Sequence, residues 1–123
     1  MSDKIIVRDD GFHPAEGQPQ VTLSPDIDPR ALADHIHHDL VAIDFPTMLD
    51  GRGFSLARRL RALGFDGRLR ATGALIADQY AMARRVGFNE VEITADLARR
   101  QPQQQWLARA DWQSWNHRDE LAG

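Results

Sequence analysis

The chain contains no cysteine among its 123 residues. This absence excludes a disulfide scaffold, a thiolate zinc site, an iron–sulfur cluster and a cysteine nucleophile within the chain. The sequence also lacks the Gly-Lys-Ser ending of a phosphate loop and the Gly-x-Gly-x-x-Gly pattern of a dinucleotide site. We therefore expect no cofactor and no metal site.

A basic excess and a long apolar run are missing as well. The chain has 15 basic and 18 acidic residues and a net charge of −3, whereas nucleic-acid binders usually present a strongly basic face. No apolar run approaches the ~20 residues that a membrane span needs, and residues 1–8 lack the apolar stretch of a secretory signal. We expect a cytoplasmic protein that binds neither nucleic acid nor membrane.

The length and composition fit one globular domain. A chain of 123 residues is close to the commonest domain size, and a hydrophobic content of 42% is ordinary. We expect a single α/β domain over residues 1–123. It would have an N-terminal strand and loop at 1–20, a βα core at 21–100 and a C-terminal tail at 101–123.

Short apolar runs alternate with turn signals through the core. Leu40–Phe45 is nearly all apolar, which is typical of a strand covered on both faces of a parallel sheet. Other strands are expected at residues 4–7, 21–23, 68–71 and 90–93, helices at 29–37, 56–63, 74–86 and 96–100, and a loop at 12–20.

Two segments of the chain have similar sequences. Residues 61–66 read Arg-Ala-Leu-Gly-Phe-Asp, and residues 84–89 read Arg-Arg-Val-Gly-Phe-Asn. Each is typical of a helix end, a glycine cap, an aromatic and a polar entry into a strand. Repeated βα units favour right-handed crossovers. The predicted fold class is α/β, either a small open parallel sheet of about four strands or a half-(βα)-barrel, with an irregular tail.

The turn after Leu40–Phe45 is the best candidate for a functional site. In open α/β sheets, ligands bind outside the carboxyl ends of the strands, and glycines there let backbone amides approach a ligand. Ser55 would open a helix whose amino end favours anions, and Arg52 would clamp phosphate, sulfate or carboxylate. The candidate ligand-binding residues are Asp44, Asp50, Gly51, Arg52, Gly53, Ser55, Arg70, Gly73, Asp78 and Gln79.

A structural interpretation of the same turn stays open. Glycine-rich turns between a strand and a helix are common, Asp50 would then only cap the turn, and Arg52 would only pair with Asp44 or Asp78. The sequence shows no nucleophile–base pair and no Gly-x-Ser-x-Gly elbow. No catalytic residue is assigned.

The tail differs in composition from the core. It holds all three tryptophans of the chain, Trp106, Trp112 and Trp115. One interpretation is that the tail folds back and packs its rings on the body, because aromatics dominate cores. The other is a docking patch for a partner protein, because tryptophan is enriched at interaction hot spots.

Several motifs in a fixed order resemble one bacterial family. They are Ile43-Asp44-Phe45-Pro46, the run from Asp50 to Arg58, Leu69-Arg70-Ala71-Thr72-Gly73, Asp78-Gln79 and Arg84-Arg85-Val86-Gly87-Phe88. The family is of uncharacterised function, is often encoded beside assimilatory sulfite reductase, and is commonly labelled a probable oxidoreductase involved in sulfite reduction. The resemblance covers residues 40–93, and Phe54 stands where the family more often has tyrosine.

The resemblance implies a link to sulfur assimilation, and the chain shows no redox motif of its own. Our first hypothesis is an accessory protein of sulfite reduction. It would bind a small anion or dock on sulfite reductase or a related sulfur-assimilation protein. The alternative is a small α/β enzyme, a lyase, isomerase or oxidoreductase partner, that uses Asp44 or Asp50 as a base and Arg52 as a clamp. A half-barrel enzyme would pair into a homodimer.

Overall fold

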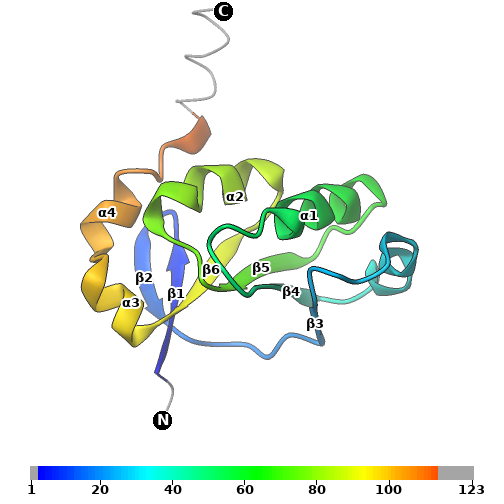
Figure 1. The fold of residues 1–123 in the computed structure, drawn as a ribbon, viewed down its shortest axis with the longest axis horizontal. Helices are drawn as coiled ribbons and strands as arrows, with labels where there is room; N and C mark the ends of the chain where they lie inside the picture. The colour runs from blue at the N-terminus through cyan, green and yellow to red at the C-terminus, as the bar shows by residue number, and fades with distance from the viewer. Residues whose placement is uncertain (1–2, 114–123) are drawn as a thin grey trace, which may run out of the picture.

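The computed structural model describes residues 3–113 (Figure 1). The strands are β1 (Lys4–Arg8), β2 (Gly11–Pro14), β3 (Val21–Leu23), β4 (Leu40–Phe45), β5 (Arg68–Gly73) and β6 (Glu90–Thr94). The α-helices are α1 (Arg52–Ala62), α2 (Tyr80–Val86), α3 (Ala95–Arg100) and α4 (Gln103–Leu107), and two 3₁₀ helices are η1 (Pro29–His35) and η2 (Ala77–Gln79). No helix in this part of the chain is long and apolar enough to cross a bilayer.

The strands form one six-stranded sheet in the order β2-β1-β6-β5-β4-β3. Strands β3 to β6 run parallel, whereas β1 lies antiparallel to both β6 and β2. The α/β class and the parallel arrangement are therefore confirmed, as an open mixed sheet. The expectation of a loop over residues 12–20 is wrong at its start. Residues 12–14 belong to β2, because the Asp9-Asp10 turn folds the chain into a hairpin with β1.

The two faces of the sheet differ in chemistry. Alternate residues of β5 and β6, among them Leu69 and Val91, are buried in the hydrophobic core beneath the helices. Figure 1 shows α1 and α2 over this face and the segment between β2 and β3 along the opposite side. The residues in between, such as Arg70 and Glu90, are polar and lie in register on the opposite face. The helices thus cover only one side of the sheet.

The echoed segments form matching helix ends. Gly64 and Gly87 have φ of +105° and +118°, which is a left-handed conformation that glycine adopts without strain. The aromatic after each glycine, Phe65 or Phe88, is buried in the core. The prediction that these two glycines end helices is confirmed.

The first helix begins earlier than the sequence predicts. Ser55 was expected to cap it, but α1 starts at Arg52 with Gly51 as the N-cap, and Ser55 lies exposed in its second turn. The reason is local: the Asp50 carboxylate accepts the backbone N–H of Arg52 at 3.1 Å. This bond satisfies one of the free amides of the first turn and lets the helix begin there.

The start of the tail packs on the body. Residues 103–107 form α4 where irregular chain was expected, and Trp106 is 1% exposed. Its ring meets Tyr80 edge to face, and its Nε1–H donates to the Gln101 carbonyl at 2.9 Å. Trp112 is half-buried beneath the guanidinium of Arg84. Trp115 lies outside the described residues, so the core interpretation holds for Trp106 in particular.

Candidate functional site

The loop between β4 and α1 lies at the carboxyl edge of the parallel strands. It is fixed to the neighbouring connection by hydrogen bonds. The Ala74 N–H donates to the Phe45 carbonyl at 2.9 Å. Gln79 Nε2 donates to the Met48 carbonyl at 2.7 Å, and Gln79 Oε1 accepts the Ile76 N–H at 3.0 Å. Gln79 was predicted to bind a ligand, and in the structure its amide bridges two loops.

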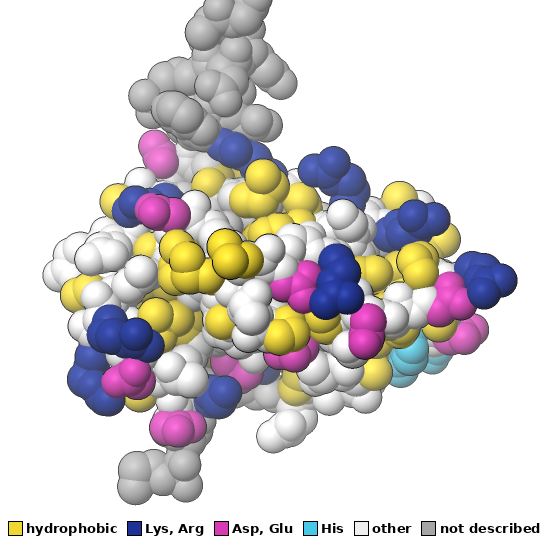
Figure 2. Space-filling view, in the orientation of Figure 1, with side chains coloured by type: hydrophobic (Ala, Val, Ile, Leu, Met, Phe, Trp, Pro, Cys, Tyr) yellow, Lys and Arg dark blue, Asp and Glu magenta, His cyan; other side chains and the backbone are white. Residues whose placement is uncertain are grey.

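The same loop exposes apolar side chains. Met48 is 47% exposed and Leu49 is 86% exposed. Figure 2 shows hydrophobic side chains gathered near the centre of the view, over the segment between β4 and α1. Beside the loop is an open pocket of about 340 Å³, lined by Met48, Gly73, Ala74, Ile76, Thr94, Leu97 and Arg100. The edge is therefore apolar where the sequence predicts an anion site.

Asp50 and Arg52 bind one another. Arg52 Nε donates to Asp50 Oδ1 at 2.9 Å, and Nη2 donates to Oδ2 at 2.6 Å. These bonds hold the pKa of the Asp50 carboxyl below its ordinary value. These two nitrogens are the ones that a guanidinium group commonly uses to bind an oxyanion through two parallel hydrogen bonds. Arg52 is thus already occupied by an internal carboxylate, and its predicted partner Asp44 or Asp78 is not the one it takes.

The two glycines of the turn have different roles. A Cβ at Gly53 would lie 2.4 Å from Cζ of Phe45, so Gly53 lets α1 pack against the end of β4. A Cβ at Gly51 would meet nothing within 4 Å. Of these two glycines, Gly51 is the one that leaves open space above its backbone.

Asp78 is engaged by another part of the chain. Its carboxylate pairs with the guanidinium of Arg109, in the segment after α4. Gly73, by contrast, ends β5 at the edge, where a Cβ would lie 3.2 Å from Oδ1 of Asp44. The structure brings Asp44 and Gly73 together and pairs Asp78 with Arg109.

Arg70 is buried at the middle of β5. Its side chain is 1% exposed, and its Nε donates to Glu90 Oε2 at 2.7 Å. Its two terminal nitrogens donate to the carbonyls of Gly17 at 3.2 Å and Glu16 at 2.6 Å. Arg70 therefore anchors the segment between β2 and β3 to the sheet, although the sequence placed it at the ligand-binding edge.

Glu90 accepts hydrogen bonds from three arginines. Besides Arg70, it accepts hydrogen bonds from Arg68 Nη2 at 2.9 Å and Arg8 Nε at 3.1 Å. Burial alone would raise the pKa of Glu90, but the bonds from Arg70 and Arg68 bring that pKa below its ordinary value. A carboxylate held by three guanidinium groups stays ionised.

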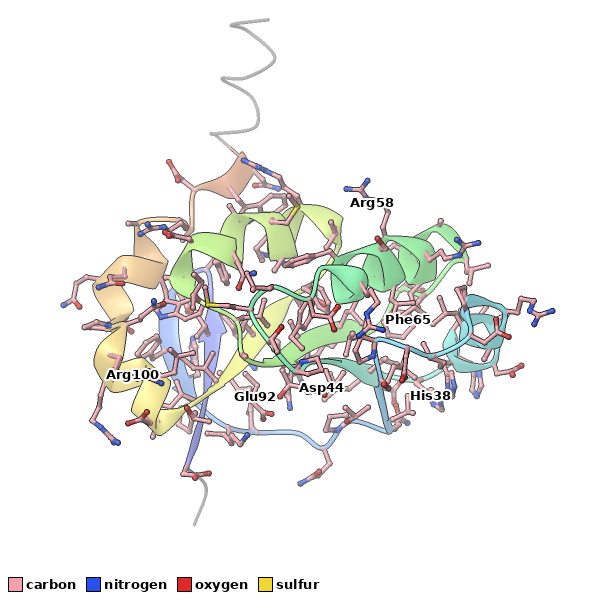
Figure 3. The ribbon with its side chains drawn as sticks, viewed as in Figure 1. His38, Asp44, Arg58, Phe65, Glu92 and Arg100 are labelled. Atoms are coloured by element: carbon pink, nitrogen blue, oxygen red, sulfur yellow. The ribbon has the colours of Figure 1, made fainter. Side chains whose placement is uncertain are left out.

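The polar face continues toward the carboxyl edge. Asp44, Thr72 and Glu92 occupy matching positions on β4, β5 and β6. Thr72 Oγ1 donates to Glu92 Oε1 at 3.0 Å, whereas the Asp44 carboxylate forms no hydrogen bond or ion pair with residues 3–113. Figure 3 shows Asp44 and Glu92 on the side of the sheet opposite α1 and α2. An open cavity of about 460 Å³ lies on this face beneath residues 15–19.

The sequence analysis missed both the exposed pair Met48 and Leu49 and the charged layer around Glu90. The sequence does contain a signal for the charged layer around Glu90. The strands Arg68–Gly73 and Glu90–Thr94 carry polar side chains at every second position. Period-two polarity in two neighbouring strands indicates that one face of the sheet is not packed against helices.

Comparison with known proteins identifies a family. Residues 20–115 match the family described as "Bacterial protein of unknown function (DUF934)". No curated protein and no solved structure matches the chain. Of the elements in residues 3–113, the matched range contains four of the six strands, every helix and the loop with Met48 and Leu49. The chain therefore belongs to the bacterial DUF934 family.

Proposed function

We propose that this protein is an accessory protein of assimilatory sulfite reduction that docks on a subunit of sulfite reductase or a related sulfur-assimilation protein. The observation that supports docking is the exposure of Leu49 (86%) and Met48 (47%) on a loop that hydrogen bonds hold in place. The link to sulfite reduction comes from the sequence motifs between residues 43 and 88, which resemble a family often encoded beside that reductase.

The loop is suited to docking because its shape is set before binding. Hydrogen bonds from Gln79 and Ala74 fix its backbone. A preformed loop loses little conformational freedom when a partner covers it. Burying an exposed leucine is worth about 1.5–3 kcal/mol, which is the scale of an interaction hot spot. Leu49 is the expected anchor.

The structure favours docking over the small-anion version of the hypothesis at this loop. The guanidinium edge that would clamp sulfite, sulfate or phosphate already binds Asp50. An external anion would have to displace an adjacent carboxylate at short range. The apolar pocket next to Met48 also suits an apolar side chain of a partner better than it suits an oxyanion.

The test is association between the purified chain and purified sulfite reductase subunits, measured by isothermal titration calorimetry. Leu49→Ser should weaken the complex by about tenfold or more, because an exposed apolar anchor is lost without harm to the core. The control is Leu107→Ser, which changes an exposed leucine on α4. Absence of association with every subunit, or equal weakening by both variants, would contradict the proposal.

A second candidate function rests on Asp44. This half-buried carboxylate has no hydrogen-bond or ion-pair partner among residues 3–113 and lies near the carboxyl edge. A base in a small lyase or isomerase needs such a free carboxylate. Growth of cells that use sulfate as sole sulfur source, compared with the calorimetric affinity, distinguishes the two candidate functions. Asp44→Asn would then abolish growth support without changing the calorimetric affinity for the reductase, whereas Leu49→Ser would change both.

A further inference from the structure

We propose that the outer face of α1 and α2 docks an acidic, partly apolar segment of a partner protein. The first observation is compositional. α1 contains four arginines and α2 contains two, and neither helix contains an acidic residue. The chain as a whole has a net charge of −3, so this concentration of positive charge is local.

Three of the six arginines are engaged within the protein. Arg52 binds Asp50, Arg61 donates to the Gly87 carbonyl at 2.7 Å, and Arg84 binds Asp9 at 3.1 Å. The other three are Arg58, Arg59 and Arg85. None of them forms an ion pair or hydrogen bond within the part of the chain that the structure describes. Figure 3 shows Arg58 extending from α1 away from the sheet.

Arg85 is the strongest indication of a missing partner. Its Nε and Nη2 atoms are buried and have no acceptor among residues 3–113. A buried N–H without an acceptor has lost its hydrogen bonds to water and gained none in return, and this loss is larger for a charged group. Arg52 and Arg84 use the same two nitrogens to hold both oxygens of a carboxylate. A carboxylate from a partner would therefore bind Arg85 in the way that Asp50 binds Arg52 and Asp9 binds Arg84.

The surface around these arginines is hollowed and partly apolar. A hollow of about 450 Å³ lies at Phe54, Arg58, Arg59 and Val86, and a second of about 500 Å³ lies at Ala81, Arg85, Ala108 and Trp112. Met82 lines both hollows and is 45% exposed. The acidic residues at the second hollow are Asp78, which Arg109 holds, and Asp111. Three guanidinium groups without a partner among residues 3–113 flank an exposed methionine, and this arrangement fits a segment that alternates acidic and apolar side chains.

The experiment measures fluorescence anisotropy of a labelled peptide of alternating glutamate and leucine, added to the full chain at low and high salt. The double variant Arg58→Glu with Arg59→Glu should weaken binding by about tenfold or more, and salt should weaken binding to the unaltered protein. The control is Arg99→Glu with Arg100→Glu, which makes the same change in net charge on α3, where both arginines pair with Asp96. This control should bind as the unaltered protein does.

Arg85 supplies a second readout. Arg85→Met should weaken peptide binding and leave the unfolding midpoint of the free protein unchanged or higher, because it removes buried donors that have no acceptor. A lower midpoint would mean that Arg85 has a structural role and would count against its part in docking. Three results would overturn the proposal: no peptide binding, equal loss in both double variants, or tighter binding of a single-stranded oligonucleotide than of the peptide. The last result would assign the face to phosphates.

Discussion

Arg70 Nε donates to Glu90 Oε2 at 2.7 Å between side chains that are 1% and 2% exposed. The pair joins the middle of β5 to the first residue of β6, and Arg70 also holds the segment that covers this face of the sheet. A buried ion pair contributes little relative to a well-packed apolar pair, but the loss of one partner leaves an uncompensated charge.

Glu90→Gln should therefore destabilise the protein by about 3–5 kcal/mol. Urea unfolding at neutral pH measures this change. The control is Glu16→Gln, because Glu16 pairs with Arg8 through an exposed carboxylate, and exposed pairs are worth about 0–1 kcal/mol. Similar losses from the two variants would contradict a special role for the buried layer.

Acid should remove the contribution of Glu90. Its folded-state pKa lies below the ordinary value of 4.5. A group with a lowered folded-state pKa contributes stability that is present above the ordinary value and is lost as pH falls through the folded value. The free energy of unfolding should thus fall with acidification below about pH 4.5. Urea titrations at a series of pH values test this, and Glu90→Gln should show a shallower fall.

Gly53 and Gly51 should respond in opposite ways to alanine. Gly53→Ala places a methyl group 2.4 Å from the Phe45 ring, which should cost about 1–3 kcal/mol. Gly51→Ala meets open space at φ −82°, and it should be neutral or stabilising by up to about 1 kcal/mol. Thermal unfolding of both variants measures the difference. Equal effects would mean that α1 does not pack on β4 as described.

Asp50→Asn should expose an anion site that the unaltered protein keeps occupied. With the carboxylate gone, the Arg52 edge and the start of α1 are free to bind sulfate. The expected result is a larger rise of the unfolding midpoint with sulfate than the unaltered protein shows, because a ligand of the folded state stabilises it.

The matched control for that prediction is Asp28→Asn. Asp28 binds Arg30 through the same Asp-x-Arg arrangement, with Nη2–Oδ2 at 2.9 Å, but on the exposed start of η1. A similar sulfate response from both variants would show a general effect of charge removal. A strong response of the unaltered protein, lost in Arg52→Ala, would instead restore the small-anion hypothesis.

Local signals in the sequence predict much of the fold. The apolar run Leu40–Phe45 and the two echoed glycine stops lie where the structure has β4 and the ends of α1 and α2. These features depend on neighbours in the chain, such as a glycine that adopts positive φ. The start of α1 was missed because a single carboxylate, that of Asp50, decides it.

The candidate site was harder to predict, because its character depends on which side chains meet. The sequence correctly places Asp44, Asp50, Arg52 and Gly73 near one edge of the sheet. It does not show that Arg52 turns back to Asp50, that Gln79 bridges two loops, or that Arg70 is buried against Glu90. Each is a contact that competes with a ligand for the same polar group.

By itself, the sequence determined the βα repeat, the parallel core and the family, because all three depend on the order and spacing of nearby residues. The tertiary structure decided which polar groups are already satisfied and which are not. Arg52, Arg61 and Arg84 find partners within the fold, while Arg58, Arg59 and Arg85 find none among residues 3–113. The physical reason is that a guanidinium group selects its partner by geometry across elements that are distant in the chain, and only folding fixes that geometry.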